Sequence, residues 1–280
     1  MVKIKIVKPK VWNFKVVKGK DAWKEVVYGA RLSGVPSEIE GKKVFQMIIE
    51  NDYTSAAEHI IIKFDVKMTK GNAPELLEHR IMSHTGYSTR YTKVSEGIDK
   101  KTPAFEIILP WHFLKTQNSK LKSQKSIFLE NVKKNLENYE KFLNEGLPKE
   151  SARYILPFCQ AVGIYHVTIN LRSLLNLLGL RLCVRASPEF RCIASQIYFN
   201  LIEKLPIMRG LVGCRGFMRG ACPENEVREK TNCPFKNQNS KIFIPTIKEI
   251  KKGIKIKKID QNEILKVQEK IFKVWANWEG

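Results

Sequence analysis

Cysteine is absent from the first 158 of the 280 residues, and no apolar run approaches the roughly 20 residues that span a bilayer. The first absence excludes a disulfide framework that ties the whole chain together. The second excludes a membrane-spanning helix, so no membrane partner is expected. The N-terminus also lacks the apolar core of a signal peptide, and a cytoplasmic protein with reduced cysteines is therefore the expectation.

Acidic side chains are scarce relative to basic ones, with 28 Asp and Glu against 49 Lys and Arg and a net charge of +21. Such an excess favours anionic partners, among them nucleotides, folate polyglutamates and nucleic acid. Because much of the excess is lysine spread along the whole chain, the charge alone does not choose between these partners. The hydrophobic content of 43% fits a globular protein with one substantial core.

Apolar periodicity predicts an α/β (α+β) fold, a central sheet with packed helices, over residues 1–205. Strands are expected in four segments: 2–17 (a strand or the entry to a hairpin), 58–68, 104–109 and 164–169. Helices are expected in seven segments: 21–32, after Ser37, from Pro74, 123–146, from Pro148, 171–178 and from Ser187 to about 205. Both serines are predicted N-caps.

The amino-acid composition changes after residue 205. Glycines and cysteines alternate irregularly over 206–238, which indicates a loop-rich segment. Residues 239–280 form a basic extension with a strand-like stretch at 242–259 and a final amphipathic helix to about Trp278. Six lysines between residues 248 and 258 fit either a strip that binds RNA or DNA or a solvated edge hairpin, and the hairpin is the commoner explanation.

A short segment, 78–91, gathers two arginines, two histidines and several hydroxyl side chains. Ser88 and Arg90 lie two residues apart, so in an extended turn they point the same way and are able to grip a phosphate together. On composition alone, a solvated basic turn is the commoner explanation of such a segment.

His79-Arg80, followed after seven residues by Ser88-x-Arg90-Tyr91, resembles the signature of the flavin-dependent thymidylate synthases. Four further elements resemble the same family and occur in its order, so the resemblance covers roughly residues 28–200. These elements are Ala30-Arg31-Leu32-Ser33, Ser55-Ala56-Ala57-Glu58-His59, Ser151-Ala152-Arg153-x-x-Leu156-Pro157 and the run from Asn170-x-Arg172 through Asn176 to Arg181.

The resemblance implies the family's fold and a set of site residues. Ser88, Arg90 and Arg153 match the grip on the nucleotide phosphate, and Arg181 matches the catalytic arginine that addresses the pyrimidine ring. A fixed guanidinium there stabilises the charge that develops on a carbonyl oxygen during hydride addition. The positions that match FAD binding are Ser55, His79, Arg80, Ile81, Asn170, Arg172 and Asn176.

The resemblance also implies FAD as cofactor, NADPH and methylenetetrahydrofolate as co-substrates, and a homotetramer with FAD at subunit contacts. Several positions depart from the family pattern. Glu78 replaces an arginine, Glu75 a glutamine, Gly86 an acidic residue and Tyr53 a histidine. Two new carboxylates near an anionic ligand weaken its binding unless they pair with arginines.

Four cysteines, Cys183, Cys214, Cys222 and Cys233, follow the Arg181 element without the close Cys-x2-Cys pairs of ordinary zinc sites. Some flavin-dependent synthases carry similar cysteines, so zinc or an iron–sulfur cluster stands beside the commoner alternative of reduced structural thiols. Cys159 and Cys192 are expected in the apolar core.

Three functions remain open. The leading one is flavin-dependent methylation of dUMP to dTMP. The second is a related flavoenzyme that acts on another pyrimidine nucleotide monophosphate, motivated by Glu75, Glu78 and Gly86. The third is a non-catalytic nucleic-acid-binding descendant of the fold, motivated by the net charge and the lysine-rich extension.

Overall fold

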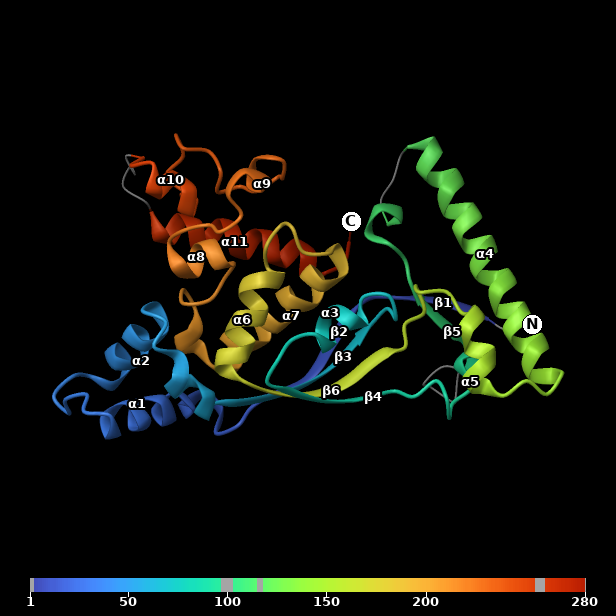
Figure 1. Ribbon diagram of the computed structural model, residues 1–280, viewed down its shortest axis with the longest axis horizontal. Helices are drawn as coiled ribbons and strands as arrows, with labels where there is room; N and C mark the ends of the chain where they lie inside the picture. The colour runs from blue at the N-terminus through green and yellow to red at the C-terminus, as the bar shows by residue number, and fades with distance from the viewer. Residues whose placement is uncertain (1–2, 97–102, 115–117, 255–259, 280) are drawn as a thin grey trace.

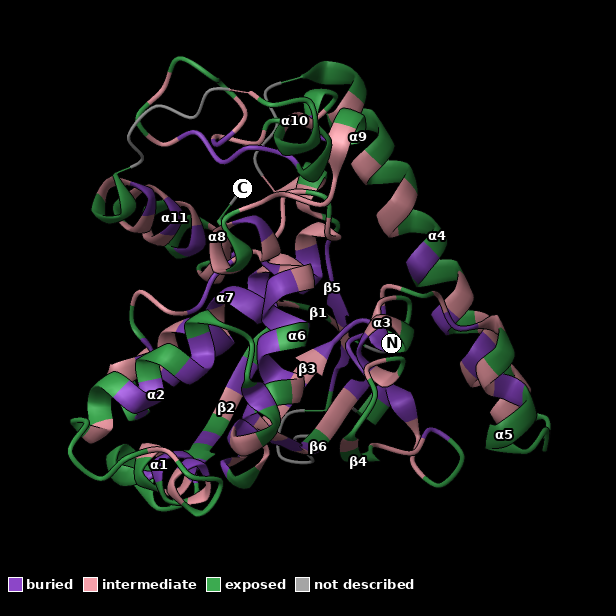
Figure 2. Ribbon diagram, turned by 60° about the vertical axis from the view of Figure 1, so that its left-hand side comes forward, coloured by how far each residue is buried: buried purple, intermediate pink, exposed green. Residues whose placement is uncertain are grey.

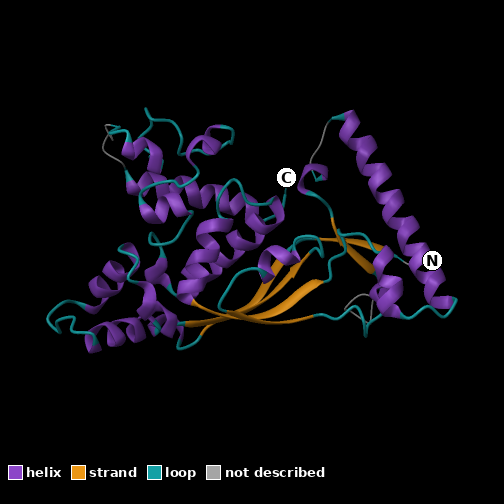
Figure 3. Cartoon of the chain, in the orientation of Figure 1, coloured by secondary structure: helices purple, strands orange, loops and turns teal. Residues whose placement is uncertain are grey.

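The computed structural model describes residues 3–96, 103–114, 118–254 and 260–279 (Figure 1). Its central feature is a four-stranded antiparallel sheet in the order β2-β3-β6-β4. These strands are β2 (Lys10–Val16), β3 (Ile61–Met68), β6 (Gly163–Asn170) and β4 (Met82–Gly86). The predicted α/β class is confirmed, with strands in the middle and helices around them (Figure 3).

The sheet buries one face under helices and leaves the other polar. Phe64, Val66 and Met68 of β3 are fully buried, and they alternate with Lys63, Asp65 and Lys67 as the period of a strand requires. Figure 1 shows helices above the sheet and at one end, with none below it. The covering helices are α1 (Trp23–Leu32), α2 (Gly41–Glu50), α3 (Ala73–Leu77), α6 (Leu171–Arg181) and α7 (Pro188–Lys204).

A second, smaller core lies beside the first. Strand β1 (Ile4–Val7) pairs in parallel with β5 (Phe105–Ile108). The long helix α4 (Ser119–Asn144) packs on this core through Val132, Leu136 and Tyr139, and the rest of it is largely exposed (Figure 2). Helix α5 (Lys149–Ala152) follows α4. The alternative of a hairpin over 2–17 is wrong, because β1 and β2 belong to different sheets.

The C-terminal part consists of short helices and one long one. These are α8 (Arg215–Arg219), α9 (Asn225–Glu229), α10 (Ile247–Lys251) and α11 (Gln261–Ala276). Helix α11 packs on α7, with the rings of Tyr198 and Phe272 5.1 Å apart. The final helix is therefore confirmed. The domain boundaries at residues 205 and 238 stay a prediction.

The remaining helical turns are of the 3-10 type. They are η1 (Gly19–Asp21), η2 (Thr54–His59), η3 (Val94–Glu96), η4 (Trp111–Phe113), η5 (Arg153–Ile155) and η6 (Pro206–Met208). Within the described ranges, no helix is both long and apolar enough to cross a membrane.

Three local predictions need correction or confirmation. Ser187 caps α7, where its hydroxyl accepts the backbone N–H of Phe190. Ser37 does not cap α2, which begins only at Gly41. The strand-like stretch at 242–259 is wrong over 247–251, because the Thr246 hydroxyl and the Glu249 carboxylate form a capping box that starts α10. Residues 255–259 of that stretch lie outside the described residues.

Candidate active site

The three residues predicted to grip a phosphate lie together at the end of β4. The backbone N–H of Arg90 donates to the Ser88 hydroxyl at 3.3 Å. The Arg153 guanidinium donates to the Thr89 hydroxyl at 3.1 Å and to the backbone carbonyl of Glu150 at 3.2 Å. The Arg90 guanidinium meets the Glu150 carboxylate at 3.1 Å. Both partners of this ion pair are 54% exposed, so it contributes little, and an incoming anion is able to compete with Glu150 for Arg90.

Arg181 ends α6 and is held from three sides. Its guanidinium donates to the Glu75 carboxylate at 2.8 Å and to the Glu75 backbone carbonyl at 3.3 Å. Its Nε–H donates to His79 Nε2 at 3.1 Å. Its guanidinium carbon lies 4.9 Å from the ring centre of Phe190. Planar stacking and charge-assisted hydrogen bonds together fix the plane of the guanidinium.

His79 is a neutral partner in this cluster. Burial, and then the charge of Arg181, lower the pKa of His79 from 6.5 to about 4. Because His79 Nε2 accepts from Arg181, that nitrogen carries no proton and Nδ1 carries it. The ring also stacks on Phe190, with centroids 6.1 Å apart. The cluster therefore presents a cation, a carboxylate and a neutral imidazole at neutral pH.

The departures from the family pattern have structural explanations at two positions. Glu75 is the ion-pair partner of Arg181, which is the compensation that a new carboxylate requires. Gly86 lies opposite Tyr165 in the sheet, and a Cβ there would come within 2.4 Å of the Tyr165 ring. A side chain at position 86 would therefore clash with this tyrosine. Glu78 is exposed just after α3, and Tyr53 is exposed as well; neither replacement is explained by the structure.

Four of the seven residues predicted to bind FAD line one hollow of about 690 Å³. They are Arg80, Ile81, Arg172 and Asn176. Ile81 has a φ of 59°, a left-handed conformation that is strained for a β-branched residue and typical of functional sites. The hollow has a volume typical of cofactor pockets. Its guanidinium groups suit a pyrophosphate and its amide suits a flavin ring, so the residues present fit FAD.

The other three predicted FAD residues are not among those that line the hollow. Ser55 is exposed in η2, beside Thr54, which does line it. His79 faces Arg181 instead. Asn170 is the N-cap of α6, where its side-chain oxygen accepts the backbone N–H of Ser173 at 2.8 Å. Capping α6 thus accounts for this side chain without any contact to FAD.

Two further arginines of the hollow were missed by the sequence analysis. Arg215 donates to the Asn176 amide oxygen at 3.0 Å, and Arg219 lies 3.5 Å from the Asp52 carboxylate. Both come from α8, four residues apart, and so lie on one helical face. This four-residue spacing, after Gly213 and within an otherwise irregular segment, was the feature of the sequence that could have predicted a short helix with both arginines on one face.

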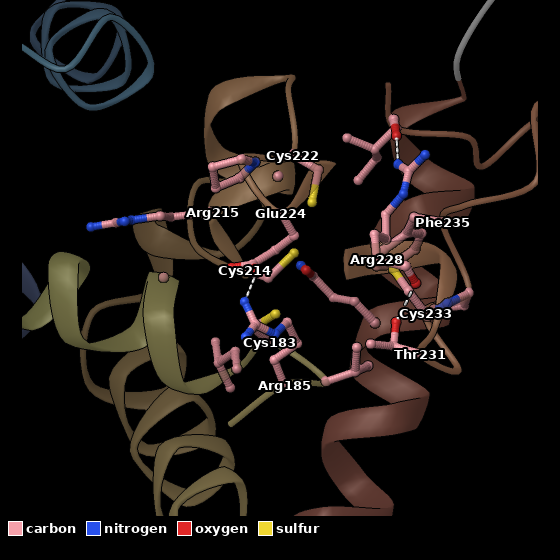
Figure 4. A pocket seen from close by; sticks show the side chains of 18 of the residues that line it. Cys183, Arg185, Cys214, Arg215, Cys222, Glu224, Arg228, Thr231, Cys233 and Phe235 are labelled. Carbon is pink, nitrogen blue, oxygen red and sulfur yellow. Dashed lines mark hydrogen bonds and ion pairs between the residues drawn. The ribbon is translucent and has the colours of Figure 1, made fainter. Parts of the chain in front are cut away.

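The four cysteines considered as metal ligands line one cavity between α6, α8 and α9 (Figure 4). All are free thiols. In the parts of the chain that the structure describes, no three His, Cys, Asp or Glu side chains are arranged to hold a single metal ion. The geometry therefore does not fit one zinc ion bound by these thiols. Cys192 is fully buried, as predicted, and Cys159 is partly buried against the second core.

Known proteins with similar sequences belong to one family. Residues 15–207 match the family described as thymidylate synthase complementing protein. A flavin-dependent thymidylate synthase of Sulfurisphaera tokodaii is 33% identical over 197 residues, which cover 68% of this chain and 71% of that protein. One from Thermococcus onnurineus is 31% identical, over 64% of this chain and 71% of the relative.

A solved structure has a similar fold. The UMP/dUMP methylase PolB from Streptomyces cacaoi, bound with 5-Br UMP, superposes with a TM-score of 0.59 at 20% identity, over 73% of this chain and 94% of that one. Since the family match covers well over half of the sequence, the chain belongs to the thymidylate synthase complementing protein family, that is, the flavin-dependent thymidylate synthases.

Proposed function

We propose that this protein methylates dUMP to dTMP, with FAD as cofactor and NADPH and methylenetetrahydrofolate as co-substrates. The observation that carries the proposal is the immobilised Arg181, held by Glu75, His79 and Phe190. A guanidinium whose plane is fixed in advance needs no reorganisation when charge develops on a pyrimidine carbonyl. The relatives' names, flavin-dependent thymidylate synthase, support the same reaction.

Each group of residues has a part in this proposal. Ser88, Arg90 and Arg153 bind the phosphate, with Arg90 exchanging Glu150 for the ligand. Arg80, Arg172 and Arg215 hold the cofactor in the hollow. When bound, reduced FAD supplies the hydride. The neutral His79 keeps Arg181 oriented without competing for the anionic substrate.

We also propose a homotetramer. The hollow is not lined by Ser88, Arg90 or Arg153, so in one chain the phosphate corner and the cofactor hollow are separate surfaces. A neighbouring subunit that brings one chain's corner to another's hollow would complete the site. Sedimentation of the purified protein measures this directly.

A second candidate substrate is another pyrimidine nucleotide, and the Glu75–Arg181 ion pair favours it. A carboxylate beside the guanidinium adds a hydrogen-bond acceptor to the base pocket and so changes which ring edge fits best. PolB, which has a similar fold, is by its name a methylase of both UMP and dUMP.

The test is titration of the flavin absorbance of the purified protein with dUMP and with UMP. Arg90→Ala and Arg153→Ala should each weaken dUMP binding by roughly tenfold or more, as loss of a charge-assisted contact does. Arg209→Ala is the control, since Arg209 is 62% exposed and pairs with Glu269 elsewhere. Unchanged affinity in both site variants would refute the phosphate corner, and a response to UMP alone would favour the second candidate.

A further inference from the structure

Four cysteines from separate parts of the C-terminal half point into one cavity (Figure 4). Cys183 follows α6, Cys214 precedes α8, Cys222 lies between α8 and α9, and Cys233 follows α9. All six pairs among the four are close enough for their charges to interact. Four free thiols that come from separate loops and line one cavity are typical of a site for a thiophilic metal.

Each of the four sulfurs accepts a backbone N–H from its own loop. Cys183, Cys222 and Cys233 accept from the residue two positions later: Arg185, Glu224 and Phe235. Cys214 accepts from Phe217, three positions later. A hydrogen bond to sulfur stabilises the thiolate, which is the form that ligates metals. Each loop therefore supplies a hydrogen bond to the thiolate that forms when a metal binds.

The four thiols are not arranged around a single ion. A single zinc ion, with Zn–S bonds of about 2.3 Å, draws its four sulfurs to within roughly 4 Å of one another. Here no three ligands among the described residues are arranged for one ion, although all four thiols line one cavity. A polynuclear cluster, in which each thiolate binds a different iron, does not need its ligands to meet at one point.

The surroundings suit an anionic, water-sensitive group. Leu182, Pro234 and Phe235 are among the apolar residues of the lining. Arg228 is only 2% exposed, and its charge lowers the pKa of both Cys222 and Cys233. Arg185 lies beside Cys183 and lowers its pKa in turn. Both arginines also pair with carboxylates, Arg228 with Glu249 and Arg185 with Glu224, so the lining carries charges of both signs beside the thiols.

The C-terminal part that contains three of these cysteines has only a small hydrophobic core. Its own core has three buried residues, Phe235, Ile244 and Ile264, and helices α8, α9 and α10 have five residues each. So small a core is typically completed by a disulfide or a metal site. The cysteines are free thiols, so a metal site formed by four of them would complete this core without a disulfide.

We propose that Cys183, Cys214, Cys222 and Cys233 bind a [4Fe–4S] cluster. Two ferrous, two ferric and four sulfide ions enter the cavity, four Fe–S(Cys) bonds form, and the four thiol protons leave to solvent, so that the [4Fe–4S]2+ state is reached without electron transfer to or from the protein. The cluster joins the end of α6 to the loops around α8 and α9. Arg215 lines both this cavity and the hollow assigned to FAD, so the cluster also positions that arginine.

The experiment is anaerobic purification and reconstitution with sulfide and equal amounts of ferrous and ferric iron. Iron, zinc and acid-labile sulfide are then measured, and electron paramagnetic resonance is recorded after reduction. These readouts do not depend on flavin or on dUMP turnover, so their failure is distinct from failure of the proposed function. The wild-type chain should hold about four iron and four sulfide, as this cluster type requires. Cys222→Ser and Cys233→Ser should lose most of both.

Cys159→Ser is the matched control, because Cys159 is partly buried but lies outside the cavity, and it should keep the full complement. The wild-type measurement stands even if a variant fails to fold. One zinc per chain without iron, two irons with two sulfides, or a metal-free protein after reconstitution would each overturn the proposal.

Discussion

His79 makes the stability of the protein depend on pH. Its pKa is about 4 in the folded protein and about 6.5 in the unfolded chain. The unfolded chain therefore binds a proton first, and the stabilisation present above pH 6.5 is lost as the pH falls toward 4. Because the side chain is partly exposed, we expect a loss of about 1–2 kcal/mol in the free energy of unfolding.

Urea unfolding at pH 7.5 and pH 4.5 measures this loss. His79→Gln keeps a neutral hydrogen-bonding side chain and should flatten the pH dependence. His112→Gln, at an exposed histidine, should keep the slope of the parent. An equal slope in all three proteins would contradict the role given to His79.

At the scale of residues, the sequence predicted which side chains gather at the candidate site better than it predicted which side chains those residues pair with. Ser88, Arg90 and Arg153 were predicted to act together and do lie together. The sequence indicated that the new carboxylate of Glu75 needs an arginine partner, but it did not identify Arg181. The two residues are 106 positions apart, and no local pattern connects them. Cys183 and Cys233 shared no motif, and only the fold brings them to one cavity.

Helix α3, which carries Glu75 and leads into His79, is anchored by a buried carboxylate from α7. Glu189 is 5% exposed, and it accepts the backbone N–H of Thr69 at 2.5 Å, the Thr69 hydroxyl at 2.8 Å and the Asn72 amide at 2.5 Å. These donors lie at the start of α3. Glu189 lies in the first turn of α7, and its contact with Thr69 spans 120 residues.

Glu189→Ala should therefore lower the free energy of unfolding by about 2–3 kcal/mol, because it leaves a buried backbone N–H without its acceptor. Thermal unfolding followed by circular dichroism measures the change. Glu203→Ala, at a 67% exposed position of the same helix, should have almost no effect. Equal melting temperatures for both variants would show that the anchor is unimportant.

Elements with strong local signals were predicted, and those defined by their neighbours were not. Helices α6 and α7 are marked in the sequence by caps and apolar periodicity. Strand β4 was missed, because Met82–Gly86 has hardly any apolar alternation and is a strand only through pairing with β6. Helix α10 was missed because its isoleucines suggested a strand, although Thr246 and Glu249 have the spacing of a capping box.

At the scale of the whole molecule, the C-terminal helix α11 closes the main core. Phe272 is 4% exposed and packs with its ring centre 5.1 Å from that of Tyr198, whose hydroxyl donates to Glu269 of α11 at 2.9 Å. Phe272→Ala should cost about 3–5 kcal/mol, as cavities left by a buried phenylalanine do.

Denaturant unfolding is the measurement, with Val274→Ala as the control, since Val274 lies on the same helix and is 53% exposed. If Phe272→Ala were no worse than the control, α11 would be an appendage rather than part of the core. The overall fold was predictable from five dispersed motifs, whereas the separate β1–β5 sheet was not, because its pairing depends on segments about 100 residues apart.

Strands β1 and β2 are synthesised well before their partners. Ile4 pairs with Phe105 of β5, and the backbone N–H of Val11 in β2 donates to the side chain of Gln196 at 2.7 Å. A growing chain on the ribosome therefore exposes these strand edges until much of the protein has been made. Lys3, Lys5, Lys8 and Lys10 recur along this exposed stretch, and lysines at strand edges discourage pairing with other chains. Part of the positive charge that suggests an anionic ligand thus protects the unfinished protein from aggregation.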